Sequence, residues 1–322
     1  MKNNKPALID RLLVESFGTF LLIAIFMAAG TYISLLGQGG LVSIALSAFL
    51  AIVVVYPIGA KVSGGHFNPA ISLMEAIRKQ ITFVEALLYI LVQLIGGVIG
   101  AGIIRLLLPS NESFPLTQWF GGISNGYGDN SPSATTLSQI ELSFSTPGSI
   151  AILAIASIIV AVTYINAQNT ECKGTFAGSL MIGAGYAIAT FLTAGIVGAG
   201  FNPVEATAVN IFATDFTAEA VEGVDNLALI KGLWLFWLVP VASAALVAIF
   251  SSAFSNTAAT APIVIEDAYA DEDDDDDEED EAPVKKAPAK KATTSTAKKA
   301  PAKKATTSTA KKAPAKKATL SK

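Results

Sequence analysis

Long apolar stretches separated by short polar segments fill the chain up to about residue 254. Because a helix needs about 20 mostly apolar residues to cross a bilayer, six of these stretches are candidate spans, at roughly 12–36, 41–59, 82–108, 148–166, 175–194 and 232–254. The pattern predicts an all-α membrane protein with six transmembrane helices. Only 15% of all residues are charged, against about a quarter in a typical soluble domain.

Two short segments interrupt this pattern, and they resemble each other. Residues 63–70 read Ser-Gly-Gly-His-Phe-Asn-Pro-Ala, and residues 198–204 read Gly-Ala-Gly-Phe-Asn-Pro-Val. Each segment lies between the second and third span of its half, so the chain repeats a unit of three spans and one short helix. Because three is odd, the second unit enters the membrane from the opposite side. The repeat therefore predicts two reentrant half-helices in an inverted repeat, meeting near the midplane.

The chemistry of these two segments suits helix starts inside a membrane. Asn is a strong N-cap and Pro is favoured at the first helical position, so we expect the half-helix caps at Asn68, Pro69, Ala70, Asn202, Pro203 and Val204. Irregular backbone at membrane depth must pack in protein or line a wet cavity. The pore-loop backbone would then comprise Gly64, Gly65, His66, Gly198 and Gly200. Two helix N-termini facing each other repel cations.

The basic residues predict how the chain is oriented in the membrane. Seven of them fall on one side of the six spans, namely Lys2, Lys5, Arg11, Lys61, Arg78, Lys79 and Lys173, and Arg105 and Lys231 fall on the other. Since cytoplasmic loops carry the excess of Lys and Arg, we expect both termini to be cytoplasmic. The outward segment 109–147 is rich in Gly, Ser, Asn and Pro. This composition favours an irregular, variable surface loop over a gating or recognition element.

Residues 256–322 differ in composition from the membrane domain, which we place at 1–255 with halves at about 10–108 and 148–254. Eleven consecutive acids occupy 271–281, and Lys/Ala/Pro repeats fill 285–322. Such a sequence cannot bury an apolar core, so a disordered cytoplasmic tail is expected. It is either simply solvated or in contact with anionic lipid head groups. Nucleic acid is not an expected partner, because the neighbouring acids compete with phosphate.

Together these motifs resemble the major intrinsic proteins, the family of aquaporins and glycerol facilitators. Beside the two Asn-Pro segments, the matches are 15–21 in the first span, 93–97 in the third, and Trp237 shortly before Pro240 in the last. The resemblance implies six tilted helices around a narrow pore, a homotetramer with one pore per subunit, and Glu15 as the structural brace of the first pore loop. It implies passive passage of water, with glycerol, urea and ammonia as further neutral candidates.

The sequence departs from the family pattern at the outer constriction. By their spacing from the two asparagines, the constriction positions are Ala48, Thr190, Ala199 and Glu205. Glu205 stands where the family usually has an arginine, and the other three side chains are small, so a wider outer filter without its cation is expected. Glu205 either caps its own helix or faces the outer mouth. The fourth span lacks the carboxylate that usually matches Glu15, which leaves the brace of the second loop open.

Other kinds of chemistry find little support in the spans. His66 is the one histidine and Cys172 the one cysteine, and we expect no metal site, cofactor or enzymatic activity. Two features favour water as the solute: the aromatic residues Phe236 and Trp237, and Ala206 in place of the aspartate typical of glycerol facilitators. The small constriction residues instead favour a larger solute. The alternative function is a degenerate channel fold that acts as a membrane scaffold through its charged tail.

Overall fold

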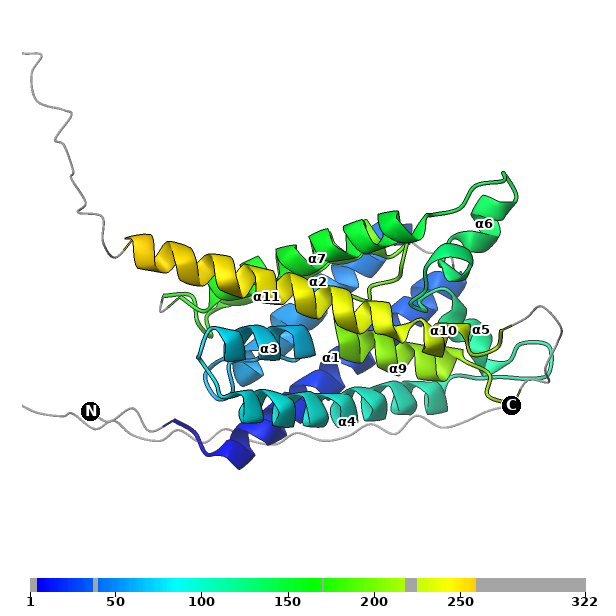
Figure 1. Cartoon of the computed structure of the whole chain (residues 1–322). Coiled ribbons are helices and arrows are strands. Elements are labelled where there is room, and N and C mark those ends of the chain that lie inside the picture. Colours follow the sequence, from blue (N-terminus) through cyan, green and yellow to red (C-terminus); the bar gives the residue numbers. More distant parts are fainter. Residues whose placement is uncertain (1–4, 37–39, 170, 218–224, 259–322) are drawn as a thin grey trace, which may run out of the picture. The chain divides into compact units, whose positions relative to one another are not determined.

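Six long helices form the body of the protein, as the apolar pattern predicts. The computed structural model describes residues 5–258 except 37–39, 170 and 218–224 (Figure 1). Within this part, six segments are long and apolar enough to cross a membrane. The long helices are α1 (Leu8–Leu36), α2 (Gly40–Ala60), α4 (Phe83–Leu107), α7 (Thr146–Ala167), α8 (Phe176–Thr193) and α11 (Leu233–Ala258). The protein is therefore a multi-pass membrane protein, and the prediction of its fold class is confirmed.

The two reentrant segments form short helices, α3 (Pro69–Ile77) and α9 (Pro203–Ala213). In Figure 1 they lie end to end between α4 and α11. Each packs on the last long helix of the opposite half, α3 on α11 and α9 on α4, and the two also contact each other. The halves of the repeat are thus interlocked rather than placed side by side, which holds both helix tips in the interior.

Glycines allow α1 and α4 to approach closely. A Cβ atom at Gly96 would overlap the backbone carbonyl oxygen of Ser16, and one at Gly100 would overlap that of Phe20. Small residues at helix contacts are common in membranes, where van der Waals packing replaces the hydrophobic effect as the main attraction between helices. This seam positions Glu15, which belongs to α1, against the first pore loop.

The segment 109–147 is more ordered than its composition indicates, so the expectation of an irregular surface loop was wrong. It contains α5 (Leu116–Gly121), the 3₁₀ turn η1 (Gly128–Asn130) and α6 (Ala134–Ser138). Phe120 is fully buried and its ring lies 6.4 Å from that of Phe212 on α9. The indole N–H of Trp119 donates to the carbonyl of Pro109 at 2.8 Å. These buried aromatic rings anchor the segment over the second half-helix.

Two further segments complete the description of the chain. The short helix α10 (Ala228–Lys231) precedes α11, which continues to Ala258 and so runs three residues past the predicted end of the membrane domain at 255. The predicted disordered tail beyond Ala258 lies outside the described residues, so its disorder stays a prediction.

The seam between α1 and α4 generates a first prediction. Gly96→Ala should lower the free energy of unfolding by about 1–3 kcal/mol, because the added methyl group meets the backbone of Ser16 rather than a movable side chain. The measurement is thermal unfolding in detergent. Gly121→Ala is the matched control, since a Cβ there has no atom within 4 Å. Equal melting temperatures for the two variants would contradict the close seam.

Candidate functional site

A single buried carboxylate holds the first pore loop. Glu15 is fully buried, and its Oε1 accepts hydrogen bonds from the backbone N–H of His66 at 2.9 Å and the Ser63 hydroxyl at 2.6 Å. Its Oε2 accepts from the N–H of Phe67 and the amide of Gln93, both at 2.8 Å. Four donors satisfy the carboxylate, which makes a buried charge tolerable. The loop backbone is thereby fixed with its N–H groups turned toward Glu15.

The first loop needs unusual backbone geometry to make this arrangement. Gly64 and Gly65 have φ values of 104° and 65°, in the region that costs glycine little and most other residues much more. Phe67 also has a positive φ of 46°. The strain of that residue is offset by its hydrogen bond to Glu15 and by full burial of its ring.

The tips of α3 and α9 meet through reciprocal hydrogen bonds. The side-chain oxygen of Asn68 accepts from the N–H of Ala70 at 2.9 Å, and its amide donates to the carbonyl of Phe201 at 3.4 Å. Asn202 does the same in the other half, accepting from Val204 at 3.1 Å and donating to the carbonyl of Phe67 at 3.0 Å. Pro69 and Pro203 occupy the first helical turns. Each asparagine therefore caps its own helix and ties it to the opposite loop.

A wide cavity opens on the side of the N-terminus. Its volume is about 670 Å³, and Gly64 and His66 line it. The carbonyl of Gly64 accepts from the hydroxyl of Tyr164 at 3.0 Å and the amide of Gln168 at 3.1 Å. Basic side chains line the same cavity, namely Lys5, Arg11, Lys61, Arg78 and Lys173. We refer to it below as the inner cavity.

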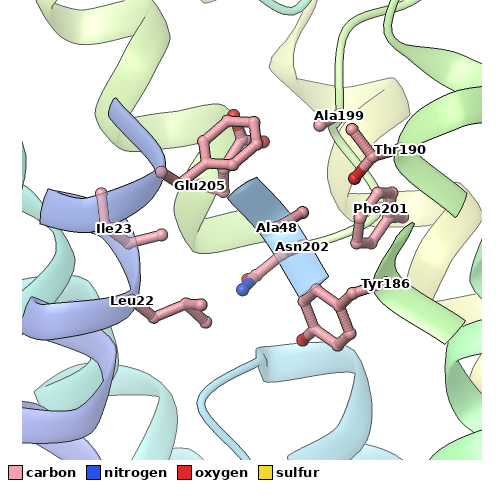
Figure 2. Close-up of a pocket in the computed structure, with 10 residues that line it drawn as sticks. Leu22, Ile23, Ala48, Tyr186, Thr190, Ala199, Phe201, Asn202 and Glu205 are labelled. Carbon is pink, nitrogen blue, oxygen red and sulfur yellow. The ribbon is translucent and has the colours of Figure 1, made fainter. Parts of the chain in front are cut away.

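A much smaller cavity lies on the other side of the helix tips. Its volume is about 20 Å³, which leaves room for about one water molecule. All four residues predicted for the outer constriction line it: Ala48 from α2, Thr190 from α8, Ala199 from the second loop and Glu205 from α9 (Figure 2). Asn202 also lines it, so this outer cavity reaches one of the two tips.

Comparison with known proteins identifies the family. The sequence pattern described as "Major intrinsic protein" matches residues 2–250. The chain belongs to the major intrinsic protein family.

Individual members and one solved structure of the family resemble this major intrinsic protein. Aquaporin Z of Photorhabdus laumondii is 27% identical over 241 residues, which are 73% of this chain and 92% of that protein. Aquaporin Z of Brucella melitensis is 26% identical over 250 residues, 75% of this chain and 96% of that protein. The X-ray structure of the aquaglyceroporin from Plasmodium falciparum has a TM-score of 0.60 at 19% identity, covering 76% of this chain and 95% of that one.

Two asparagines lie beside the second loop of this major intrinsic protein and tie the segment after α5 to α9. The N–H of Asn125 donates to the side-chain oxygen of Asn210 at 2.8 Å, and the Asn210 amide donates back to the carbonyl of Asn125 at 2.8 Å. The Asn125 side chain fits against the loop so closely that a Cβ at Gly198 or Gly200 would overlap its Oδ1. Asn125 therefore supports the second loop by close packing, and its Oδ1 accepts no hydrogen bond from the described residues of that loop.

Glu205 faces the outer cavity. Its Oε1 accepts from the amide of Asn125 at 3.2 Å, and its Oε2 has no hydrogen-bond partner within the described part of the chain. The side chain is only 4% exposed. Of the two interpretations of Glu205, these contacts favour a side chain that faces the outer mouth over one that only caps α9.

Sequence reasoning missed two residues of this site. Tyr186 lines the outer cavity with its ring edge-to-face on Phe201, the centroids 5.3 Å apart, and its hydroxyl interacts with the side chain of Asn68. Its position four residues before Thr190 puts both on one face of α8, a signal that could have revealed it. Asn125 had no such signal, since only the fold brings it to Glu205.

The brace of the first loop generates a second prediction. Glu15→Ala should lower the free energy of unfolding by about 3 kcal/mol or more, because it leaves the buried N–H groups of His66 and Phe67 without acceptors. Thermal unfolding in detergent measures the effect. Glu112→Ala, which removes an exposed acid, is the control. If Glu15→Ala and the control had the same melting temperature, the loop would be held by other contacts.

Proposed function

We propose that this protein is a passive channel that conducts water through the junction of α3 and α9. The observation that carries the proposal is the pair of helix tips at Asn68 and Asn202, with the inner cavity on one side and the outer cavity on the other. Membership in the major intrinsic protein family supports it. So do the printed names of the relatives, Aquaporin Z and aquaglyceroporin.

The junction favours neutral solutes over cations. Each of α3 and α9 directs its N-terminus toward the midplane, and a helix N-terminus carries roughly half a positive elementary charge. The side chains of Asn68 and Asn202 are neutral and leave this charge at the tips, and Glu205, in the first turn of α9, offsets part of it on the side of the outer cavity. A cation at the junction would therefore meet repulsion from both helices, whereas a water molecule would not.

The outer cavity favours small solutes. Although its constriction residues are small, the ring of Tyr186 and the apolar side chains of Leu22, Ile23 and Phe26 also line it and leave room for about one water molecule. We infer that water is the principal solute, and that glycerol and urea pass more slowly. The size limit would then lie at Tyr186 rather than at Ala48 and Ala199.

The scaffold alternative finds no support among the described residues or the relatives. We keep three finer proposals with the channel: a homotetramer, both termini in the cytoplasm, and contact of the Lys-rich tail with anionic lipid. The family resemblance supports the first. The basic side chains around the inner cavity, on the side of the N-terminus, support the second, and the tail composition supports the third.

The channel function is tested by osmotic swelling. Proteoliposomes that contain the full chain should respond to an osmotic gradient well above the rate of empty vesicles, because the path avoids the cost of dissolving water in lipid. Stopped-flow light scattering gives the rate. A rate equal to that of empty vesicles would remove the channel assignment.

The size limit is tested at Tyr186. Tyr186→Leu should raise glycerol permeability several-fold relative to water permeability, because it removes the phenol from the narrow cavity. The measurement compares swelling rates in glycerol and in an impermeant osmolyte. Tyr32→Leu removes a tyrosine that is 45% exposed on α1 and lines neither cavity. If both variants exclude glycerol as the wild type does, the limit lies elsewhere.

A further inference from the structure

The inner cavity is lined by an excess of positive charge. Of the acidic residues that the structure describes, Glu75 alone lines it, and Glu75 forms an ion pair with Arg78. The basic side chains that line it are those of Lys5, Arg11, Lys61, Arg78 and Lys173. Glu85, which does not line the cavity, pairs with Arg11 and comes within 4.0 Å of Lys5. The excess therefore rests on Lys61 and Lys173, which form no ion pair within the described part of the chain.

Two separate elements bring Lys61 and Lys173 to the rim of this cavity. Lys61 directly follows α2, and Lys173 lies in the loop between α7 and α8. The alkyl chain of Lys61 lies against Gly174, where a Cβ atom would be 2.9 Å from its Cε. Glu171, on the same loop, is exposed and does not line the cavity. Because two cations at one rim attract a doubly charged anion more strongly than a singly charged one, the arrangement favours a dianion.

Arg11 offers hydrogen-bond donors at the buried end of the cavity. Its side chain is only 6% exposed, and its Nη2 donates to Glu85. Its Nε and Nη1 have no hydrogen-bond partner within the described residues. The hydroxyl of Tyr89 also interacts with Arg11, but one neutral oxygen does not satisfy both donors. Since a buried donor without a partner costs free energy, Arg11 favours a ligand that supplies acceptor oxygens.

The size of the inner cavity indicates a ligand larger than a free inorganic anion. Its volume of about 670 Å³ lies within the range of small-molecule sites, about 300–1,000 Å³. Apolar side chains, those of Pro6, Ile81 and Ile165, also line it and offer contacts for an organic group. Arg11 and Lys173 both lie within electrostatic range of His66 on the first pore loop. A ligand held by these two cations therefore lies near the inner end of the junction.

We propose that the inner cavity is a binding site for phosphate monoesters, whose dianionic phosphate lies among Lys61, Lys173 and Arg11. Phosphate oxygens accept several charge-assisted hydrogen bonds at once, and Lys and Arg are their usual partners. Because Gly64 and His66 line the same cavity, the organic part of the ligand lies across the inner entrance of the water path. Binding therefore slows water passage, and this second step rests on the proposed channel function.

Binding is tested without transport, by thermal unfolding of the full chain in detergent. The probes are phenyl phosphate and short-chain phosphatidic acid, which represent a soluble ester and a lipid head group. At about pH 8 both are dianions, since the second pKa of a phosphate monoester is about 6. Each should raise the melting temperature in a saturable way, because a ligand of the native state stabilises it.

The matched control ligand is benzenesulfonate, which has the same ring and one negative charge. At equal ionic strength its apparent affinity should be about fivefold weaker than that of phenyl phosphate. A protein stabilised by neither ester, or equally by phenyl phosphate and benzenesulfonate, would overturn the site. Stabilisation that appears only when the acids at 271–281 are replaced by Asn and Gln would also overturn the ester as the ligand of the natural chain.

Variants assign the binding to the two lysines. Lys61→Gln and Lys173→Gln should each weaken the apparent affinity for phenyl phosphate about two- to fivefold, because each removes one exposed charge, and the double variant about tenfold. Lys79→Gln is the matched control, since Lys79 is exposed and does not line the inner cavity. An unchanged affinity in the folded double variant, or an equal loss in Lys79→Gln, contradicts the assignment.

Osmotic swelling tests the effect on water passage. In proteoliposomes of neutral lipid, phenyl phosphate on both sides should lower the water permeability severalfold, over the same concentrations that raise the melting temperature, while benzenesulfonate has less effect. A second set contains phosphatidic acid in the bilayer and no soluble ester, with phosphatidylglycerol as its singly charged control. A fall in the first set assigns the site to soluble esters, and a fall in the second assigns it to a lipid head group.

The outcomes separate this inference from the proposed function. Esters that stabilise the protein without changing its water permeability overturn the effect on passage and leave the binding site. A protein that passes no water under any condition overturns the channel, while the melting temperatures still decide whether the site exists. A protein that passes water and is stabilised by neither ester overturns the site and leaves the channel.

Discussion

The reciprocal hydrogen bonds between two asparagine amides and two loop carbonyls are the contact on which the rest of the molecule depends. Each tip is tied to the loop of the other half, from Asn68 to Phe201 and from Asn202 to Phe67. Each half-helix is therefore held in part by the opposite repeat. The cross-packing of α3 on α11 and of α9 on α4 adds to this exchange.

The two loops are held in place by different chemistry, although the repeat makes them equivalent in position. In the first half a buried carboxyl group lies behind the loop, where four donors satisfy Glu15. In the second half the neutral pair Asn125 and Asn210 ties the segment after α5 to α9, and Asn125 supports the loop by packing alone. The carboxylate of this half, Glu205, lies instead at the cavity. The inverted repeat thus preserves the shape of the junction, while the buried carboxyl group lies behind the loop in the first half and at the cavity in the second.

Local chemistry explains which parts of this architecture the sequence predicts. Asn is favoured as an N-cap and Pro at the first helical position, so two such pairs at matching places predicted both half-helices. The odd number of spans in each repeat predicted their inversion. The resemblance to the family supplied the constriction positions Ala48, Thr190, Ala199 and Glu205, and all four line the outer cavity. No local sequence signal predicts the ordered structure of the α5–η1 segment. Its order depends on burial of Phe120 against α9, a contact between residues far apart in the chain.

The distribution of charge along the path is the last consequence of these contacts. The outer cavity contains a buried carboxylate, the midplane contains the positive ends of α3 and α9, and the inner cavity is lined by basic side chains such as Lys61 and Lys173. A neutral molecule meets little change in electrostatic energy across this series, whereas a cation is attracted at the outer end and repelled from the midplane inward. If an arginine occupied the position of Glu205, as is usual in the family, the repulsion would begin at the outer constriction. With Glu205 in that position, the repulsion of cations begins at the tips, where the asparagine ties hold two helix N-termini against each other, and continues along the basic inner cavity.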